Sequence, residues 1–408
     1  INGNYWRMKT TFDQAMAAVL ATAKDYGIES ISLIESVHRV LREDVSADRD
    51  FPPFDRVAMD GIAINFDHFD HKSKMAEITG IAAAGSSKQE LINRKSCFEV
   101  MTGAVLPEGA DTVIRYEDIN IEGSTVTVAD IELRKGQNVH NQGLDRRAGD
   151  LIIDQGTRIS PAEIGVGASV GQTHVRVSKL PKCIIISSGN ELVNIHEEPK
   201  AHQIRKSNSH QIGSMLSAKG IVADVEHLND NEEEIENKLS KFLDQYDVII
   251  VSGGVSKGKF DFIPGVLDKL GVERLFHKVE QRPGKPLWFG QHGGGTLVFA
   301  LPGNPVSSFM CALAFFSPWL LKSLGSKEEE STYAMLSEDV SFKPNLTFFL
   351  QVRVKNEKGQ LKAYPIKGKG SGDLANLVDA DGFLIIPQGY DNYTAGSAHP
   401  FISFRNLT

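Results

Sequence analysis

The sequence predicts a multidomain α/β protein built around a doubly wound central domain. Strand-like and helix-like segments alternate between Leu180 and Gly325, which is typical of a parallel sheet with helices on both faces. Shorter strand-like segments, separated by glycine and proline, lie on either side of this region and predict small β domains. With 408 residues, the chain is also longer than a single hydrophobic core usually supports.

Composition argues against several classes of protein. The net charge of −8 and the pI near 5.9 speak against a surface for duplex nucleic acid. The three cysteines form no CxxC pair, which argues against a disulfide framework or a structural zinc site and favours a reducing compartment. The longest apolar run, Met310–Leu321, is interrupted by Ser317-Pro318 and predicts a buried helix rather than a membrane span. No signal-peptide pattern is recognisable at the start.

The first part of the chain is expected to mix a few helices with many short strands. Thr11–Gln14 has the pattern of a capping box and predicts a helix to about Tyr26. We expect a strand at Ile31–Ile34, a helical turn at Val37–Leu41 and a closely packed helix at Pro161–Val170. The strands of the small β-rich domain are expected at Gly61–Ile64, Ala76–Ile81, Cys97–Met101, Thr112–Tyr116 and Ser124–Val128.

The central domain follows from strands that alternate with helices. Asp230 is expected to cap the helix Glu232–Gln245, which carries three acids at its positive end. The other strands and helices are expected at Cys183–Ser187, Ser207–Lys219, Val222–His227, Val248–Val251, Phe262–Leu270 and Thr296–Leu301, with a last helix to about Leu324. After a charged linker, Lys327–Glu330, strands return at Phe348–Val354, Leu361–Pro365 and Gly382–Pro387 and predict a terminal β-barrel or sandwich.

Three turns should meet at the carboxyl edge of the central sheet, where open α/β sheets bind ligands. They are Ser187–Glu191, Ser252–Asp261 and Leu301–Ser307, and all contain small residues. The second turn predicts a phosphate loop built from Ser252, Gly253, Gly254, Ser256 and Gly258. Glu191 and Asp261 place carboxylates beside it, which indicates a bridging Mg²⁺. The alternative is that both acids are helix caps.

The same turn nearly matches a P-loop. Gly253 is followed after four residues by Gly258-Lys259, but Phe260 stands where a P-loop has the Ser or Thr that holds Mg²⁺. A P-loop ATPase is therefore disfavoured but stays open.

Rigid cations form a second constellation. Arg282 and Lys285 lie in the sequence RPGKP, whose prolines and glycine restrict the backbone, and Lys278 lies nearby. Such an arrangement suits an oxyanion or phosphate, although a solvated basic loop is the alternative. Lys367–Gly372, with Ser371, is a weaker anion-binding candidate and could equally be a flexible surface loop.

The Pro-Pro loop near the start of the β-rich domain is harder to interpret chemically. It presents Asp55 and Asp60, and Met101–Ala104 is another turn of small residues. From chemistry alone, a structural role for these turns is as good an interpretation as a functional one.

Together these motifs resemble a known family. The chain is similar to the molybdopterin molybdenumtransferases, the molybdenum-insertion enzymes of molybdenum cofactor synthesis, whose eukaryotic relative is the gephyrin E domain. The resemblance covers the chain nearly end to end, and SGGVSxGxxD followed by PGKP and LPGNPVS is highly specific. It rests on PPFDRVAMDG (52–61), MTGAVLPEGADTVIRYED (101–118), GLDRRAGD (143–150), SSGNELV (187–193), VSGGVSKGKFDF (251–262), RPGKP (282–286) and LPGNPVSSF (301–309).

The resemblance implies a homodimer of four-domain subunits. The expected domains are an elongated helical domain (8–48 with 149–179), a β-rich domain (49–148), the molybdopterin-binding-like α/β domain (180–326) and a C-terminal β-barrel (327–408). The active site is expected between the α/β and C-terminal domains of one subunit and the β-rich domain of the other. Other cofactor-synthesis proteins are expected as further partners, with no nucleic acid and no membrane, and the location is expected to be cytoplasmic.

The implied reaction joins molybdate to adenylylated molybdopterin and releases AMP, assisted by Mg²⁺ or Zn²⁺. Matching positions give Glu191, Asp230 and Asp261 as the acids around nucleotide and metal, with Asp261 and Glu191 as metal ligands. Asp60 and Thr102 are expected from the partner subunit. The residues expected around phosphate and molybdate, or closing that pocket, are Lys278, Arg282, Lys285, Pro286, Ser307, Arg353 and Ser371.

Two positions depart from the family pattern. Asn190 stands where an aspartate is common, and Arg282 stands where lysine is usual. Two other activities stay open: a molybdopterin adenylyltransferase, which would consume ATP, and a non-enzymatic scaffold of the gephyrin type.

Overall fold

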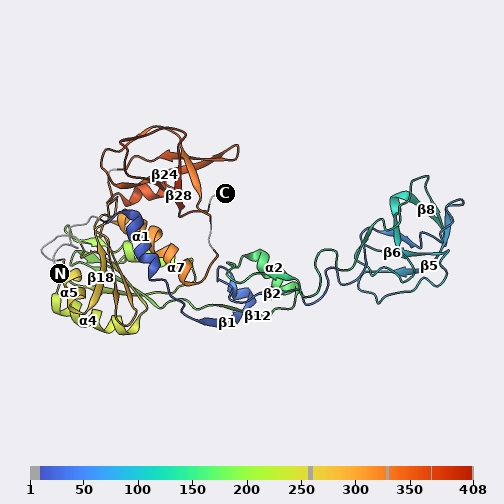
Figure 1. The fold of residues 1–408 in the computed structure, drawn as a ribbon, viewed down its shortest axis with the longest axis horizontal. Helices are drawn as coiled ribbons and strands as arrows, with labels where there is room; N and C mark the ends of the chain where they lie inside the picture. Colours follow the sequence, from blue (N-terminus) through green and yellow to red (C-terminus); the bar gives the residue numbers. More distant parts are fainter. Residues whose placement is uncertain (1–9, 256–260, 328–329, 369, 407–408) are drawn as a thin grey trace. The chain divides into compact units, whose positions relative to one another are not determined.

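The structure is a computed structural model that describes residues 10–255, 261–327, 330–368 and 370–406. Its chain forms two compact units, coloured along the sequence in Figure 1. The first unit comprises the residues up to Arg42, Gly156–Ser160 and the residues from Val175 onward. The second unit comprises Glu43–Gln155 and Pro161–His174. The four-domain boundaries expected from the sequence stay a prediction.

A six-stranded sheet forms the centre of the first unit. Its order is β16-β13-β17-β21-β20-β18, with the first four strands parallel and the last two antiparallel. The antiparallel pair was not anticipated from the sequence. The strands are β13 (Cys183–Ser188), β16 (Asp224–Leu228), β17 (Val248–Ser252), β18 (Val272–His277), β20 (Trp288–His292) and β21 (Leu297–Leu301). A separate short parallel pair is formed by β14 (Leu192–Val193) and β15 (Ile204–Arg205).

Helices cover both faces of this sheet, which confirms the doubly wound class. Alternate residues of β13 and β17 point to opposite faces: Ile185 and Ile250 enter one buried cluster, while Ile184 and Ile249 enter the other. Figure 1 shows α4 and α5 on one side of the sheet and α1 and α7 on the other. The helices are α1 (Phe12–Ala21), α3 (Asn208–Ser217), α4 (Glu232–Gln245), α5 (Ile263–Lys269), α6 (Pro305–Cys311) and α7 (Ser317–Ser323).

Helix α4 begins with a different cap from the one predicted. Asn231, not Asp230, is the N-cap, and its side chain accepts a hydrogen bond from the backbone N–H of Glu234 at 2.9 Å. The sequence could not distinguish the two neighbouring candidates, because Asn and Asp are equally good N-cap residues. Asp230 is thereby available for another contact, described below.

The long apolar helix predicted around Met310–Leu321 lies in the core. It runs continuously through α6, the π-turn η4 (Ala312–Phe316) and α7. The helix Pro305–Ser323 is long and apolar enough to cross a membrane. However, 83% of an apolar 18-residue stretch within it is buried inside the protein. The π-turn ends just before Pro318, which has no N–H to continue the ordinary helical ladder. The prediction of a buried helix is confirmed.

The C-terminal part closes into a five-stranded β-barrel. Pairings run β24-β25-β22-β28-β26 and return to β24. Phe349 and Phe383 of this barrel belong to the same buried cluster as the helices above the sheet, so the barrel packs on the α/β part. Its strands are β22 (Tyr333–Leu336), β24 (Thr347–Glu357), β25 (Gln360–Pro365), β26 (Gly382–Ile386) and β28 (Ala398–Ser403); β23 (Val340–Ser341) and β27 (Asn392–Tyr393) form a side pair, and η5 (Leu374–Val378) is a 3₁₀ helix.

The N-terminal segment confirms the capping box but shortens the helix. Thr11 and Gln14 exchange the two reciprocal hydrogen bonds, and α1 ends at Ala21 rather than near Tyr26. The Asp25 side chain accepts from the N–H of Gly27, whose φ is +94°, and this turn redirects the chain. The predicted helical turn at Val37–Leu41 is wrong: a 3₁₀ helix, η2, lies at Leu33–Ser36 instead, between β1 (Ile28–Ser32) and the bridge of Val40 to Arg158.

The second unit contains a six-stranded mixed sheet with the order β7-β4-β6-β5-β9-β8. Buried clusters cover its two faces, one around Val57 and Phe98 and the other around Ile62 and Phe69. Its strands are β4 (Gly61–Ile64), β5 (Met75–Ala82), β6 (Cys97–Val100), β7 (Thr112–Arg115), β8 (Ile119–Glu122) and β9 (Thr125–Val128). The smaller elements are β2 (Val45–Ser46), β3 (Arg56–Val57), β10 (Val139–His140), β11 (Leu151–Ile153), the 3₁₀ helix η3 (Tyr116–Asp118) and α2 (Pro161–Ser169); β12 (His174–Ser178) leads back into the first unit.

Candidate active site

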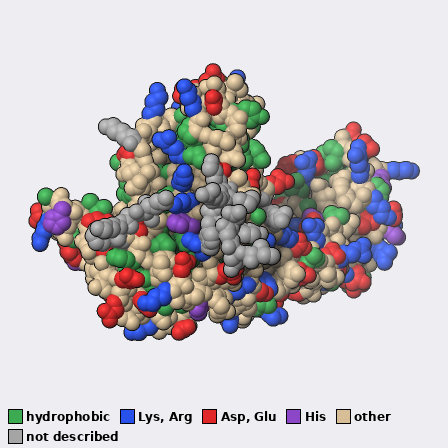
Figure 2. Space-filling model, turned by 60° about the vertical axis from the view of Figure 1, so that its left-hand side comes forward, with side chains coloured by type: hydrophobic (Ala, Val, Ile, Leu, Met, Phe, Trp, Pro, Cys, Tyr) green, Lys and Arg blue, Asp and Glu red, His purple; other side chains and the backbone are tan. Residues whose placement is uncertain are grey.

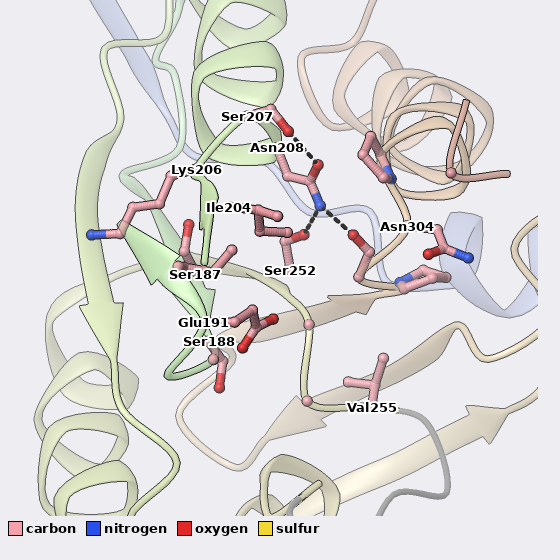
Figure 3. A pocket seen from close by; sticks show the side chains of 18 of the residues that line it. Ser187, Ser188, Glu191, Ile204, Lys206, Ser207, Asn208, Ser252, Val255 and Asn304 are labelled. Atoms are coloured by element: carbon pink, nitrogen blue, oxygen red, sulfur yellow. Dashed lines mark hydrogen bonds between the residues drawn. The ribbon is translucent and has the colours of Figure 1, made fainter. Parts of the chain in front are cut away.

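Three strands of the central sheet end level with one another and bring their turns together. Ser187 of β13 pairs in register with Ser252 of β17, which pairs with Leu301 of β21. A first pocket of about 610 Å³ opens at this edge (Figure 3). Each of the three predicted turns contributes to its lining, as do the segment Ile204–Asn208 and residues Asp230, Pro286 and Gly372.

Glycines allow the turns to approach closely. Gly253 has φ +99°, and a side chain there would place Cβ only 2.7 Å from the carbonyl oxygen of Ser188. Gly254 has φ +68°, and its Cβ would lie 2.8 Å from Cγ1 of Ile263. Both positions need glycine because of conformation and because of space. Ser256 and Gly258, predicted in the same loop, lie outside the described residues.

An asparagine that sequence reasoning missed connects two of the turns. The Nδ2 of Asn208 donates to the Ser252 hydroxyl at 2.8 Å and to the carbonyl oxygen of Gly303 at 2.7 Å (Figure 3). Ser252 in turn lies 3.2 Å from the buried Ser308 hydroxyl. Asn208 is the first residue of α3, and nothing in its local sequence distinguishes it from an ordinary helix start. Only the fold shows that it faces the pocket.

Three of the predicted carboxylates line this pocket: Glu191, Asp230 and Asp261. Asp230 and Asn190 form a reciprocal pair, in which the Asp230 N–H donates to Asn190 Oδ1 at 3.0 Å and the Asn190 N–H donates to Asp230 Oδ2 at 3.2 Å. An amide oxygen at position 190 therefore accepts the same bond that a carboxylate would accept. The departure at Asn190 preserves this link between the turns after β13 and β16.

The carboxylates suit a cation shared with a substrate better than a cation held by protein alone. Among the residues that the structure describes, no three His, Cys, Asp or Glu side chains are close enough together to hold a metal. Mg²⁺ is commonly bound by one or two carboxylates together with substrate phosphates and water. Glu191 and Asp261, in one pocket beside the phosphate turns, fit that kind of site.

A second pocket of about 780 Å³ adjoins the first and contains the predicted cations. Arg282 and Lys285 are exposed and line it, and Pro286 lines both pockets. The Arg282 guanidinium lies 6.0 Å from the centre of the Phe342 ring, within the range of a cation–π contact. The opposite wall comes from the barrel, chiefly Leu346–Gln351 and the loop that carries Ser371.

The loop that carries these cations is firmly held. Gly284 has φ +88°, and a Cβ there would lie 2.6 Å from Cys311 Sγ and 2.8 Å from Gln281 Nε2. The buried Gln281 amide donates to the Gly284 carbonyl at 3.1 Å. The short strand β19 (Gln281–Arg282) pairs with β24 of the barrel. Arg282 and Lys285 are therefore presented by an anchored backbone, as the prolines and glycine predicted.

Ser371 joins the barrel to the turn after β21. Its hydroxyl accepts from Asn304 Nδ2 at 2.8 Å, and its carbonyl accepts from the Val306 N–H at 3.2 Å. Ser371 lines the second pocket and Gly372 lines the first. The segment is thus part of the boundary between the two pockets.

Three predicted residues do not line either pocket. Lys278 has φ +71° and its N–H donates to the Leu287 carbonyl, while Ser307 is buried in the first turn of α6. Arg353 is half-exposed on β24 and pairs with Asp379, with 3.3 Å between Nη2 and Oδ1.

Asp60 and Thr102 lie in the second unit and contact each other. The Thr102 N–H donates to Asp60 Oδ1 at 2.6 Å. This backbone hydrogen bond stabilises the carboxylate and lowers the pKa of Asp60. The pair is a preformed turn with an exposed anion. Its predicted place opposite the first unit's pockets, in a partner subunit, stays a prediction.

Charges of both signs occur around the pockets. On the face shown in Figure 2, acidic and basic side chains are interspersed over the α/β part and the barrel. Within the first pocket Arg205 and Lys206 accompany the three acids, but Lys206 is drawn aside because its Nζ donates to Asn194 Oδ1 at 3.0 Å. Among the residues that the structure describes, the lining of the second pocket contains Arg282 and Lys285 and no acidic side chain. The three acids thus lie in the first pocket, while both pockets contain cations.

Comparison with known proteins assigns this fold to a class. Residues 10–171 match the family described as MoeA N-terminal region (domain I and II), residues 184–322 match the probable molybdopterin binding domain, and residues 333–404 match the MoeA C-terminal region (domain IV). The fold is shared with a crystal structure of the molybdopterin biosynthesis MoeA protein from Pyrococcus horikoshii, with a TM-score of 0.82 at 27% identity, covering 97% of this chain and 100% of that one. The fold is that of the MoeA class of molybdopterin-biosynthesis proteins.

Curated relatives narrow the class to a family. The molybdopterin molybdenumtransferase of Synechocystis is 37% identical over 96% of this chain and 98% of its own length. The corresponding protein of Bacillus subtilis is 31% identical over 94% and 91% of the two chains. The chain belongs to the molybdopterin molybdenumtransferase family and is a transferase of molybdenum cofactor biosynthesis.

Proposed function

We propose that this protein inserts molybdenum from molybdate into adenylylated molybdopterin and releases AMP. The observation that carries the proposal is the pair of adjoining pockets that share Pro286. One pocket combines glycine turns with carboxylates, and the other presents two cations on an anchored loop. A substrate with a phosphoanhydride at one end and a metal-accepting group at the other needs two such environments side by side.

The first pocket supplies the nucleotide end. The Ser252–Gly254 turn and the Ser187–Gly189 turn bring backbone close to the substrate phosphates, and Asn208 keeps the Ser252 and Gly303 turns together. A divalent cation, Mg²⁺ or Zn²⁺, held by Asp261, Glu191 and the substrate phosphates, would neutralise phosphate charge. Asp230, tied to Asn190, keeps the neighbouring turn in position.

The second pocket supplies the molybdate end. Molybdate is a compact dianion, and Arg282 and Lys285 are two cations held three residues apart on a backbone that cannot easily move. Lysine offers a point charge and arginine a planar fork, so the pair can contact two faces of a tetrahedral oxyanion. Because molybdate is held next to the bound dithiolene, a bimolecular step becomes effectively unimolecular.

In the proposed reaction, an oxygen of molybdate, or of a water aligned by it, attacks the phosphorus of the adenylyl group. The P–O bond of the anhydride breaks, and the molybdopterin keeps its own phosphate. When the attacking oxygen belongs to molybdate, its Mo–O bond breaks as the two dithiolene sulfurs bond to molybdenum, AMP departs with that oxygen, and the two thiol protons are released. When the attacking oxygen belongs to water, AMP departs with the water oxygen, and molybdenum loses one oxygen as water, with the two thiol protons, as the sulfurs bond to it. The residues of this chain position the attacking oxygen and stabilise charge on the leaving phosphate.

Mixing purified protein with adenylylated molybdopterin and Mg²⁺, with and without molybdate, tests the coupling. We expect AMP to appear only when molybdate is present, because the attacking oxygen belongs to molybdate or is aligned by it. AMP release at the same rate without molybdate would refute the coupling. Molybdopterin and ATP provide a second arm: formation of adenylylated molybdopterin would assign the adenylyltransferase activity instead.

The proposal includes a homodimer whose subunits share each active site. Asp60 and Thr102 would come from the second unit of the partner. Asp60→Asn and Asp261→Asn variants, each inactive alone, should regain AMP release when mixed and allowed to exchange subunits, because one site of the mixed dimer is then intact. A mixture that stays inactive despite subunit exchange would place Asp60 and Asp261 in the same subunit's site, or Asp60 outside the reaction.

A cytoplasmic location and transfer of the product to other cofactor-synthesis proteins complete the proposal. Support comes from the three unpaired, buried cysteines, which suit a reducing compartment. A stoichiometric protein partner without any turnover would instead favour a scaffold.

A further inference from the structure

Two phenylalanine rings lie beside Arg282 in the lining of the second pocket. Phe342 follows β23 and Phe348 is the second residue of β24, so both belong to the barrel. Their rings are nearly parallel, with an interplanar angle of 8° and centroids 4.2 Å apart. Phe342 is 7% exposed, and Phe348 is partly buried against the same core cluster. The two stacked rings, the aromatic platform, therefore pack on the barrel core and reach the pocket.

The backbone holds Arg282 and the aromatic platform in fixed register. Arg282 of β19 pairs with Phe348, and on its other side Phe348 pairs with Ile386 of β26. The Phe342 N–H donates a hydrogen bond to the Asp391 carbonyl at 2.8 Å. The position of the platform relative to Arg282 is thus set by strand pairing and not by side chains alone.

The Arg282 guanidinium lies over the Phe342 ring, with Cζ 6.0 Å from the ring centre. This distance is at the outer limit of a cation–π contact, an interaction that arginine makes more often than lysine. Among the residues that the structure describes, the Arg282 side chain makes no hydrogen bond and no ion pair. The ring contact is therefore the interaction that orients this side chain, and its N–H groups stay available to an anion.

The aromatic platform gives a physical reason for arginine at position 282, where lysine is usual in the family. A guanidinium is planar, delocalised and weakly hydrated, so it can lie on a ring while its N–H groups donate in its own plane. An ammonium is a compact, strongly hydrated point charge and gains less from the same surface. The departure at Arg282 and the stacked rings thus fit together.

We propose that Phe342 and Phe348 are positioning residues for Arg282, which hold its guanidinium in the orientation that binds molybdate. The inference rests on the function proposed above, because it takes the second pocket as the molybdate site. An anion that binds an unrestrained arginine must first order that side chain, at a cost that corresponds to about two- to tenfold in affinity. On the platform, part of this ordering is already present before molybdate binds.

Calorimetric titration with molybdate alone measures the effect of the platform. Phe342→Leu keeps an apolar side chain in the barrel core but removes the ring under Arg282, so molybdate should bind about two- to tenfold more weakly. Phe401→Leu is the matched control, because Phe401 is 6% exposed in the same core cluster and does not line the second pocket. It should lose comparable stability in urea and leave molybdate affinity unchanged. Unchanged affinity in Phe342→Leu, or an equal loss in both variants, would overturn the proposal.

A double-mutant cycle with Arg282→Lys separates positioning from packing. Lysine keeps the positive charge but lacks the planar group that uses the ring. Phe342→Leu should therefore change molybdate affinity by less than about twofold in the Arg282→Lys background, although it has its full effect in the wild-type background. The same loss in both backgrounds would show that the ring acts through packing and not through Arg282, and would refute the proposal.

Lys285→Met distinguishes a failure of this inference from a failure of the proposed function. If molybdate binds the wild-type protein, is lost in Lys285→Met and is not weakened in Phe342→Leu, only the role of the platform is refuted. If the wild-type protein does not bind molybdate, or if Lys285→Met binds it equally well, the second pocket is not the molybdate site and both proposals fail.

Discussion

Removing the side-chain amide of Asn208 tests whether the turns after β17 and β21 must be held together for the reaction. Its Nδ2 makes two hydrogen bonds, at 2.8 Å to Ser252 and at 2.7 Å to the Gly303 carbonyl. A typical intramolecular hydrogen bond contributes about 0.5–1.5 kcal/mol, so Asn208→Ala should cost about 1–3 kcal/mol. If this loss falls entirely on the transition state, kcat/KM for AMP release drops about 5–150-fold.

Asn208→Asp sharpens the test, because aspartate keeps the shape but loses both N–H donors and brings negative charge toward the Gly303 carbonyl. We expect a loss at least as large as that of Asn208→Ala. His210→Ala, an exposed change in the same helix, is the matched control. The assay is the initial rate of AMP release over a range of substrate concentrations, with the unfolding temperature measured in parallel. Wild-type kcat/KM in either Asn208 variant would refute the idea that this bridge positions the turns.

Three further predictions address the metal, the cation loop and pH. Asp261→Asn should abolish AMP release while circular dichroism stays that of the folded protein; full activity would exclude Asp261 as a metal ligand. Gly284→Ala should lower the unfolding free energy by about 1–3 kcal/mol, because its Cβ would meet Cys311 Sγ, and it should weaken molybdate binding. The control Gly293→Ala has open space around the new Cβ, so it should change neither chemical denaturation nor molybdate titration. Burial lowers the pKa of His227 and His277 below the usual 6.5, so the unfolded chain binds more protons, and unfolding free energy should fall as pH drops through 6.5. His277→Gln should flatten that dependence in urea titrations at pH 7.5 and 5.5; an unchanged slope would contradict it.

The central fold was predictable because its signals are local. Runs such as Val248–Val251 are too apolar for any place but a buried strand, and the glycines after them mark the turns. The antiparallel strands β18 and β20 were missed because only the short strand β19, and no helix, lies between them in the sequence. Alternation of strand and helix predicts parallel pairing. It gives no prediction of strand direction where two strands follow each other without a helix between them.

The sequence predicted the turns that line the candidate site, but not the side-chain hydrogen bonds that connect these turns. Glu191, Asp230 and Asp261 do line one pocket, and Arg282 and Lys285 line the next. Asn208 is absent from the prediction because its partners are 44 and 95 residues away in sequence, a separation that no local pattern reports. Arg353 shows a different limit, because matching by position could not reveal that its guanidinium pairs with Asp379; its role in the site stays a prediction.

The short strand β19 has a consequence for how the two halves of the first unit depend on each other. Its residues Gln281 and Arg282 hydrogen-bond to the barrel strand β24, and the Thr347 N–H donates to the Glu280 carbonyl at 3.0 Å. The same segment is covalently continuous with β18 of the central sheet. A truncated protein that ends before the barrel would therefore lose more than one wall of the second pocket. Its cation loop would also lose the backbone partner that sets its direction, and Arg282 and Lys285 would become ordinary charges on an untethered connection.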